Sequence, residues 1–335
     1  MQMHPSFIII GKLAREYILP AEGQPLLDSP GGNVLYAAGG LAVWETHAGL
    51  VARLGEDAPR AWMEVLEGRG FDVRGLRIQP GELDLRSFAA YNETLEINNN
   101  NPVGHFARLG IPFPKALLGF QPHEETKSLR SKLSPATPLL NDMPTDYMDA
   151  GVLHLCPLEL TAHLQFMDSL RAAMHTITLD PSSGYMIPAG MREVRSVCNG
   201  LTAFLPSLEE ITSLFWGQTH DVWEMAEALG EFGCEYIIIK CGAEGQLLYD
   251  AAKKQRYEIP AYPVKVVDPT GAGDAFCGGF LAGYRKDYDA LEGVLYGNVS
   301  ASLAIEGSGP LYALERMPGL AQARLASLRE MVRKI

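Results

Sequence analysis

Long apolar runs and an excess of basic residues are both absent from the sequence. No run of roughly eighteen apolar residues occurs in the chain, so we expect no membrane-spanning helix. Only 28 lysines and arginines stand against 40 aspartates and glutamates, which gives a formal net charge of −12. Because nonspecific binding to nucleic acids depends on basic side chains that neutralise phosphates, nucleic acid is not expected as a partner.

Paired cysteines and metal-binding histidine spacings are also missing. The five cysteines are an odd number and include no Cys-x-x-Cys pair, so reduced thiols in a cytoplasmic protein are expected. The eight histidines show neither His-x-x-x-His nor Glu-x-x-His spacing, and a transition-metal site is not indicated. The opening sequence MQMHPSFIII lacks a basic region before its apolar run, which favours a first strand over a signal peptide.

Short apolar runs alternate with helical patterns along most of the chain. The runs lack polar alternation, as strands do when both faces of a sheet are covered. The expected strands span residues 7–10, 47–55, 151–155, 176–180, 201–205 and 236–240, and the expected helices include residues 33–45, 58–67 and 161–174. Strands that alternate with helices indicate βαβ units. We therefore predict one α/β domain over residues 1–335, with a mostly parallel central sheet and helices on both of its faces.

Residues 75–113 break this alternation. They contain β-prone pieces and the asparagine run NNNN, but no convincing helix. We predict a small β element that projects from the main domain, and a long surface loop is the alternative.

A glycine-rich stretch late in the chain, DPTGAGDAFCGGF at residues 268–280, carries the clearest chemical signal. It follows an expected strand at residues 264–267 and predicts a turn that opens a helix. Such a turn points free N–H groups and the positive end of the helix dipole at one place, which makes an anion site. Asp274, in the first turn of the helix, is either a common helix-start carboxylate or a general base beside the anion. No Gly-Lys-Ser/Thr follows, so the stretch is not a Walker A loop.

The same stretch resembles the C-terminal signature of the ribokinase-like, or PfkB, family of carbohydrate kinases. Residues 31–57, GGNVLYAAGGLAVWETHAGLVARLGED, are similar to the N-terminal signature of that family, and the order and spacing of the two also fit. The resemblance implies a three-layer α/β/α fold and transfer of the γ-phosphoryl group of ATP to a hydroxyl of a small sugar. It also implies a lid over the sugar, formed mainly by residues 75–113 with a contribution from about residues 12–30.

By this resemblance, Asp274 is the base that deprotonates the sugar hydroxyl, and the turn Gly271, Ala272, Gly273 supplies the anion hole. The candidate sugar-binding residues, besides Asp274, are Glu16, Gly32, Asn33 and Glu159. Glu16 and Ala14 stand where the family typically has an Asn-x-Asp pair. Surface or helix-capping roles are the alternatives for the sugar-binding candidates.

The resemblance also implies residues around the nucleotide and its cations. The candidates for binding ATP are Ser207, Lys240, Gly242, Gly245, Asn298, Ser302 and Gly309. In the segment LPSLEE, Glu210 matches a glutamate that arranges Mg²⁺ and its waters, whereas Ser207 replaces the usual asparagine. Asp268 matches a position that helps to bind a monovalent cation such as K⁺. Helix caps, turn aspartates, hairpin glycines and a buried helix are the alternative explanations for these residues.

Three functions are open from the sequence. The first is an ATP-dependent sugar kinase that uses Mg²⁺, with a homodimer through the lid as the common assembly of the family. The second is a nucleoside kinase of the same family. The third is a protein that senses a ligand on this fold without turnover, which the departures at Ala14 and Ser207 suggest and the retained GAGD sequence opposes.

Overall fold

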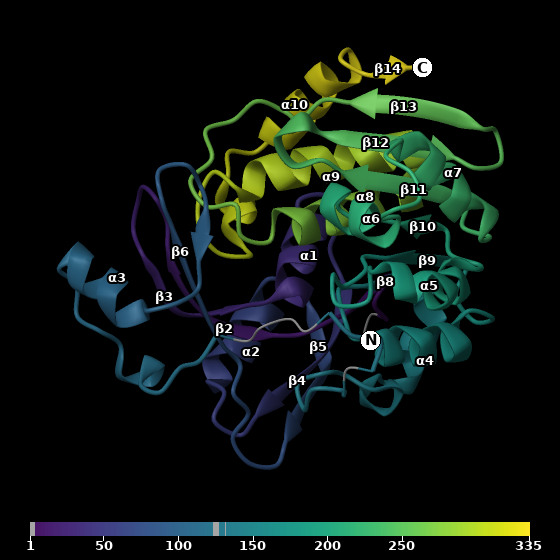
Figure 1. The fold of residues 1–335 in the computed structure, drawn as a ribbon. Helices are drawn as coiled ribbons and strands as arrows, with labels where there is room; N and C mark the ends of the chain where they lie inside the picture. The colour runs from purple at the N-terminus through teal and green to yellow at the C-terminus, as the bar shows by residue number, and fades with distance from the viewer. Residues whose placement is uncertain (1–3, 123–126, 131) are drawn as a thin grey trace.

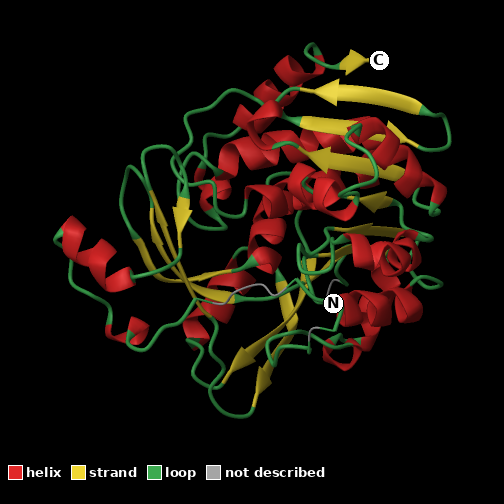
Figure 2. Cartoon of the chain, viewed as in Figure 1, coloured by secondary structure: helices red, strands yellow, loops and turns green. Residues whose placement is uncertain are grey.

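The computed structural model describes residues 4–122, 127–130 and 132–335. Within these residues, a ten-stranded sheet forms the centre of the molecule and a four-stranded sheet projects beside it (Figures 1 and 2). In spatial order the main sheet contains β14 (Arg333–Lys334), β13 (Gln255–Ile259), β12 (Gln246–Asp250), β11 (Tyr236–Lys240), β10 (Ala203–Phe204), β9 (Thr176–Leu179), β8 (Val152–Leu155), β1 (Phe7–Ile10), β4 (Ala48–Gly55) and β5 (Asp72–Gln79). The strands from β11 to β5 pair in parallel, and β12, β13 and β14 pair in antiparallel fashion at one edge. The prediction of a mostly parallel sheet is confirmed.

Two expected strands differ from the structure. Residues 264–267 form no strand, since the amides of Val267 and Asp268 both donate to the carbonyl of Ile305, at 2.8 and 3.2 Å, and not to a neighbouring strand. The strand expected at residues 201–205 is reduced to the two residues of β10.

Helices cover both faces of the main sheet (Figure 1). The set α1, α2, α8, α9 and α10 packs on one face, and the set α4, α5, α6 and α7 packs on the other. The α-helices are α1 (Asn33–Ala42), α2 (Arg60–Gly68), α3 (Pro102–Leu109), α4 (Leu160–Leu170), α5 (Met191–Cys198), α6 (Leu208–Leu214), α7 (Val222–Glu231), α8 (Ala272–Asp287), α9 (Ala290–Ala304) and α10 (Leu320–Arg329). The expected three layers are therefore present.

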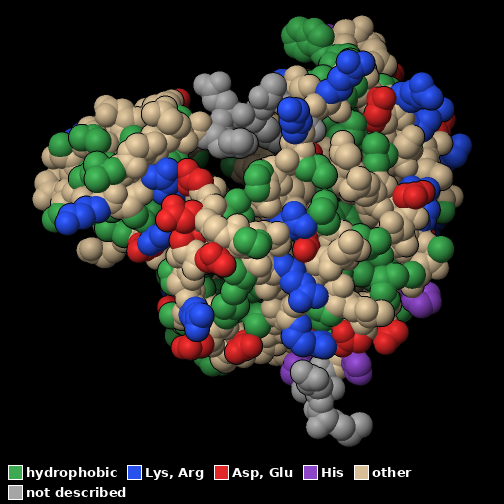
Figure 3. Space-filling view, turned by 90° about the horizontal axis from the view of Figure 1, so that it is seen from below, with side chains coloured by type: hydrophobic (Ala, Val, Ile, Leu, Met, Phe, Trp, Pro, Cys, Tyr) green, Lys and Arg blue, Asp and Glu red, His purple; other side chains and the backbone are tan. Residues whose placement is uncertain are grey.

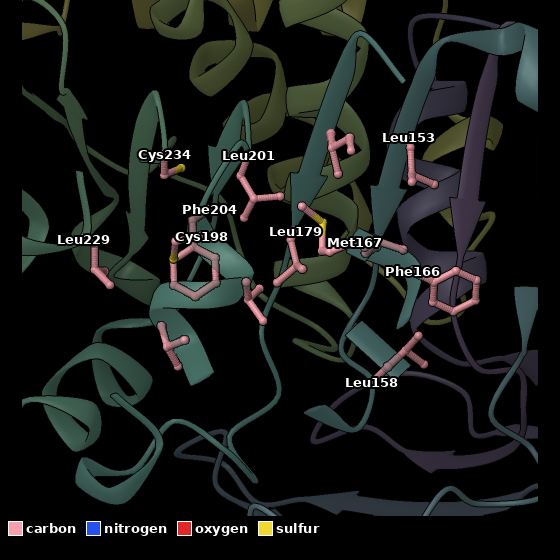
Figure 4. Packing of buried hydrophobic residues seen from close by; sticks show 14 of the residues in the cluster. Leu153, Leu158, Phe166, Met167, Leu179, Cys198, Leu201, Phe204, Leu229 and Cys234 are labelled. Carbon is pink, nitrogen blue, oxygen red and sulfur yellow. The ribbon is translucent and has the colours of Figure 1, made fainter. Parts of the chain in front are cut away.

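The layer that contains α4 to α7 buries a continuous apolar core against the sheet. Leu153, Leu179 and Phe204, from three neighbouring strands, pack in one cluster with Phe166 and Met167 of α4 (Figure 4). All five side chains are at most 2% exposed. Because burial of one large apolar side chain stabilises the fold by about 1.5–3 kcal/mol, this cluster makes the sheet a rigid support for the residues at its edge.

Glycines allow α1 and α8 to approach closely on the other face of the sheet. A Cβ atom added to Gly278 of α8 would lie 1.8 Å from the carbonyl oxygen of Ala37, and one added to Gly40 of α1 would lie 2.0 Å from that of Ala275. Larger residues at these positions would force the two helices apart. The contact therefore fixes the relative position of the two helices that begin at the sequence signatures.

The four-stranded sheet is the small β element that the sequence predicts, and we call it the lid sheet. Its strands, in spatial order, are β3 (Leu26–Gly31), β2 (Ala14–Leu19), β6 (Arg86–Tyr91) and β7 (Ile97–Asn98). It projects from the main body as a separate lobe (Figures 1 and 3). The lid begins later in the chain than expected, because β5 belongs to the main sheet and ends only at Gln79.

The lid also contains a helix that the sequence analysis did not predict. Asn101 precedes α3 and accepts the N–H of Gly104 through its side chain at 3.1 Å, and Pro102 occupies the first helical position. Phe106 of α3 packs against Phe88 of β6, so the helix covers one face of the lid sheet. A homodimer through the lid stays a prediction, and it would have to use a surface other than this covered face.

Two expectations drawn from missing sequence features agree with the structure. In the described part of the chain, no helix combines the length and the apolar character needed to cross a membrane. All five cysteines are free.

Candidate active site

The turn before α8 presents backbone N–H groups that have no hydrogen-bond partner in the described part of the chain. Gly271 has φ +68°, a left-handed conformation that favours glycine, and the amide of Ala272 donates to the carbonyl of Pro269 at 3.2 Å. The amides of Gly271, Gly273 and Asp274 have no hydrogen-bond partner among the residues that the structure describes. The predicted anion hole is thus corrected at one position, because the turn itself uses the amide of Ala272.

Asp274 lies in the first turn of α8, and the residue is partly buried. It forms no hydrogen bond or ion pair with any other described residue. Burial, together with the nearby carboxylate of Asp180, raises the pKa of Asp274 to about 7 against the opposing effect of Lys240. A carboxylate whose pKa lies near neutrality suits a general base, since it can accept a proton and then release it.

Lys240, at the end of β11, places its ammonium group beside the start of α8. Its Nζ donates to the carboxylate of Asp180 at 2.5 Å, and a Cβ added to Gly273 would lie 3.3 Å from the same Nζ. Although burial lowers it, the neighbouring Asp180 raises the pKa of Lys240 above its ordinary value, so the ammonium stays charged. A positive charge, paired with the carboxylate of Asp180, therefore lies beside Gly273.

A cavity of about 360 Å³ lies between the glycine pair before α1 and the lid sheet. Gly32 and Asn33 line it from the main domain, and Ser87 and Phe88 line it from β6. Gly32 has φ +89°, and a Cβ there would lie 2.5 Å from the carbonyl oxygen of Lys12, so only glycine fits. The structure thus brings two of the predicted sugar-binding residues to a cavity that can hold a small polar ligand.

Asn33 and Glu159 support the wall of this cavity through hydrogen bonds. Asn33 accepts the amide of Lys12 at 2.8 Å and donates to the carbonyl of Pro157 at 2.9 Å. Glu159 accepts from Nζ of Lys12 and from the hydroxyl of Thr137, both at 2.8 Å. Because Lys12 lines the cavity, both predicted residues hold part of its wall in place.

Glu16 lies beneath the glycine pair and is not among the residues that line this cavity, so its direct contact with a sugar hydroxyl stays a prediction. One carboxylate oxygen accepts the amide of Gly32 and the other accepts the hydroxyl of Tyr36, each at 2.9 Å. Glu16 is only 4% exposed, and burial raises its pKa to about 7. Ala14 does line the cavity but offers no polar group to a ligand.

Asn298 and Ser302, expected near the nucleotide, bind other groups inside the protein. The side chain of Asn298 donates to Gln246 and to the carbonyl of Pro260, and it accepts the amide of Tyr262, at 2.7–3.0 Å. The hydroxyl of Ser302 likewise donates one hydrogen bond and accepts another inside the protein. Each residue is 3% exposed, so direct contact with a nucleotide would require these bonds to break.

Gly242, Gly245 and Gly309 all adopt positive φ angles. The first two lie in the turn between the antiparallel strands β11 and β12, where a Cβ on Gly245 would lie 2.0 Å from the carbonyl oxygen of Ile259. The backbone conformation alone accounts for glycine at these positions. Their contact with a nucleotide stays a prediction.

Residues 147–317, just over half of the chain, match the family described as pfkB family carbohydrate kinase. The chain belongs to the pfkB family. This confirms the family membership that the signatures at residues 31–57 and 268–280 imply, and it makes the protein a kinase by family.

Relatives of this pfkB protein include kinases for different acceptors. The cytidine kinase of Thermococcus kodakarensis is 25% identical over 280 residues, which cover 83% of this chain and 88% of the relative. A fructokinase of Klebsiella pneumoniae is 24% identical over 291 residues, which cover 84% of this chain and 85% of the relative. A structure from E. coli assigned as ribokinase II, in complex with ATP and Mg²⁺, matches with a TM-score of 0.68 at 17% identity and covers 98% of this chain and 99% of its own. Likeness at that identity shows the ribokinase-like fold.

Glu210 and Asp268 are the two acidic positions at which the signatures of this pfkB chain imply cations. Glu210 accepts the amide and the hydroxyl of Ser207 at 2.7 and 2.8 Å, and burial, with the charge of Asp180, raises its pKa to about 7. Asp268 accepts the amide of Thr270 through Oδ1 at 2.9 Å, whereas its buried Oδ2 has no partner. The described residues contain no cluster of three metal-ligating side chains. A cation here would therefore need further oxygens from the backbone, from water or from phosphates.

Asp180 is a candidate site residue that the sequence analysis missed, since it pairs with Lys240 and lies near Asp274. It follows β9 directly, at the carboxyl edge of the parallel sheet where open α/β folds bind ligands. The available signal was a single aspartate after the apolar run TITL, which also fits an ordinary turn. Its pairing with Lys240, 60 residues away, becomes visible only in the folded chain.

Proposed function

We propose that this pfkB protein transfers the γ-phosphoryl group of ATP to a hydroxyl of a small sugar or sugar derivative. The observation that best supports the proposal is the start of α8, where the amides of Gly271 and Gly273 and the carboxylate of Asp274 have no partner among the described residues, and the ammonium of Lys240 lies beside Gly273. Amides and an ammonium stabilise the negative charge of a migrating phosphoryl group, and a carboxylate accepts the proton of the attacking hydroxyl.

In this mechanism, Asp274 takes the proton of the acceptor hydroxyl as the hydroxyl oxygen bonds to the γ-phosphorus. The bond from that phosphorus to the bridging oxygen breaks, and ADP leaves with the electron pair. The amides of Gly271 and Gly273 donate to oxygens of the transferred group, and Lys240 adds positive charge. The lid sheet over the cavity excludes water, which favours transfer to the acceptor over hydrolysis of ATP.

ATP and Mg²⁺ are the proposed ligands on the phosphate side, with K⁺ as a candidate at Asp268. Bound Mg²⁺ would neutralise phosphate charge, and Glu210 would hold its waters. The support for a monovalent cation is the buried Oδ2 of Asp268, because a buried carboxylate oxygen without a partner is costly.

Charged side chains on the cavity wall are paired, which favours an uncharged acceptor. Lys12 pairs with Glu159 at 2.8 Å, and Arg86 pairs with Asp84 at 2.7 Å. An acidic sugar would have to displace one of these carboxylates before it gained a cationic partner. Neutral sugars are therefore the first candidates.

A nucleoside is the second candidate acceptor. Phe88 and Phe120 both line the cavity, and their rings meet edge to face with centroids 6.4 Å apart. Aromatic rings offer an apolar surface on which a base can stack, and the similar protein of T. kodakarensis is a cytidine kinase.

The test is phosphorylation of a panel of neutral sugars, acidic sugars and nucleosides with ATP and Mg²⁺. We expect the wild type to phosphorylate an uncharged acceptor, and Asp274→Asn to be slower by about 10²–10⁴-fold. Asp287→Asn, at the other end of α8, is the matched control and should keep wild-type activity. Comparable turnover in Asp274→Asn would disprove the assignment of the base, and ATP binding without transfer to any acceptor would favour a ligand sensor.

A further inference from the structure

Two strands of the lid sheet are linked to the turn before α8. The hydroxyl of Tyr91, the last residue of β6, lies 2.8 Å from Oγ1 of Thr270, and either group can donate. The second link starts at Glu16 of β2, which accepts the hydroxyl of Tyr36. The ring of Tyr36 occupies the space beside Gly271, where an added Cβ would lie 2.0 Å from its Cγ. Both strands therefore reach the turn that carries the free amides.

The lid sheet fixes the position of Tyr91. The residue is 8% exposed, and its ring packs with Ile18 of β2, Ala89 of β6 and Leu26 of β3. Because tyrosine has only two side-chain torsions and this ring is enclosed, the hydroxyl follows the strand that carries it. The position of the Thr270 side chain is thereby tied to the lid.

Thr270 is restrained from two directions. Its amide donates to Oδ1 of Asp268 at 2.9 Å, and its hydroxyl is bonded to Tyr91. The peptide group that joins Thr270 to Gly271 is planar. The N–H of Gly271 therefore rotates whenever the backbone of Thr270 rotates. Because glycine permits many backbone conformations, Gly271 itself offers little resistance to such a rotation. The two bonds to Thr270 oppose it, together with the bonds that the carbonyls of Pro269 and Gly271 accept from the amides of Ala272 and Ala275.

We propose that Tyr91 is a positioning residue: it holds Thr270 so that the free amide of Gly271 stays aimed at the transferred phosphoryl group while the lid stands over the acceptor. The inference rests on the proposed function and extends it to a residue that acts through the turn. It implies that the lid does more than exclude water, because one of its strands also sets the geometry of the anion hole.

Kinetics of conservative variants test this role. Tyr91→Phe removes the hydroxyl and keeps the ring, and we expect kcat to fall about fivefold to tenfold, as for one lost hydrogen bond, with the KM for the acceptor and the Tm nearly unchanged. The fraction of ATP that is hydrolysed without transfer should rise. Tyr257→Phe is the matched control, since it loses a 2.7 Å bond to Gln255 within β13, and it should keep the wild-type kcat.

Substitutions of Thr270 complete the test. Thr270→Val should reproduce the loss seen in Tyr91→Phe, whereas Thr270→Ser should retain activity because it keeps the hydroxyl. The double variant Tyr91→Phe/Thr270→Val should be no slower than either single variant, because both remove the same bond. Losses that multiply in the double variant would overturn the proposal.

Amide hydrogen exchange tests the positioning without any turnover. The amides of Ala272 and Ala275 are bonded to the carbonyls of Pro269 and Gly271, so they report on the turn. Their exchange should be faster in Tyr91→Phe than in the wild type or in Tyr257→Phe, and exchange within β6 should not change. Wild-type exchange at these amides would overturn the proposal. A wild type that phosphorylates nothing would instead overturn the proposed function, and the exchange result would still decide whether Tyr91 holds the turn.

Discussion

The turn before α8 and the region around Asn298 of α9 belong to neighbouring helices, yet their polar groups are in opposite situations. At the turn, the amides of Gly271 and Gly273 and the carboxylate of Asp274 have no partner in the described part of the chain. Around Asn298, each polar atom of the side-chain amide is hydrogen bonded inside the protein. Unpaired groups lower stability and are retained where a ligand pairs them, whereas paired groups support the architecture. The comparison therefore separates residues that should change kinetics from residues that should change stability.

Replacement of Gly271 should have the largest effect. Alanine there would need a positive φ and would place Cβ 2.0 Å from the ring of Tyr36, so the turn must change shape and its amides must move. Loss of one such donor costs about 10²–10³-fold in kcat, and we expect at least about a 100-fold loss in Gly271→Ala. The control is Gly70→Ala, which has φ +89° but open space around it, and it should lose stability while keeping most activity. Similar kcat values for the two variants would contradict the distinction between residues that change kinetics and residues that change stability.

The pH dependence of kcat/KM should show the second-largest effect. Asp274 must be deprotonated to accept a proton, and its pKa is raised to about 7, so kcat/KM should rise about tenfold per pH unit below pH 7 and then level off. The native carboxyl binds its proton more tightly than the unfolded one, so its contribution to stability falls as the pH rises from about 4 through 7. Asp274→Asn should accordingly raise the Tm at pH 8 more than at pH 4 in thermal melts. A kcat/KM plateau that extends down to pH 5 would contradict this role for Asp274.

Asn298→Ala should mainly change stability. It would leave the amide of Tyr262, the carbonyl of Pro260 and the side chain of Gln246 without their buried partner, at a cost of about 2–3 kcal/mol in the free energy of unfolding. Urea unfolding measures this loss, and the KM for ATP should change only about threefold or less, within the range of one weak contact. A large rise in that KM at unchanged stability would instead show that Asn298 contacts the nucleotide.

Substitutions of Ser207 should have the smallest effect. Its hydroxyl accepts the amide of Glu210 at 3.2 Å and caps α6, so Ser207→Ala should cost about 1 kcal/mol in unfolding experiments. Ser207→Asn restores the residue usual in the family and keeps a capping side chain, so its stability should match the wild type. If both variants unfold like the wild type, the cap contributes nothing measurable.

Much of the fold could be predicted because the central strands are buried on both faces and read as continuous apolar runs, as Phe7–Ile10 does. The lid was harder to predict. The helix α3 has a start signal at Asn101, but two of its apolar residues, Val103 and Leu109, are exposed, so its apolar periodicity is weak. The valines of residues 264–267 suggested a strand, but the amides of Val267 and Asp268 bond to Ile305, a tertiary contact that no local pattern shows.

The site was predictable where the backbone conformation itself requires a residue type. Gly32 and Gly271 need positive φ, and their signatures predicted both turns. The pairing of Asp180 with Lys240 and the burial of Glu16 depend on which strands become neighbours, so the sequence predicted neither.

The tight glycine contact between α1 and α8 bears on how such a chain can diversify. The close contacts at Gly40 and Gly278 leave no room for α1 and α8 to slide past each other. The distance between Gly32, before α1, and Gly271, before α8, is therefore fixed by the packing of these two helices. The lid comes from separate stretches of the chain and carries much of the remaining cavity wall. Exchange of the lid would therefore change the cavity wall, while the start of α1 and the turn before α8 kept their relative position.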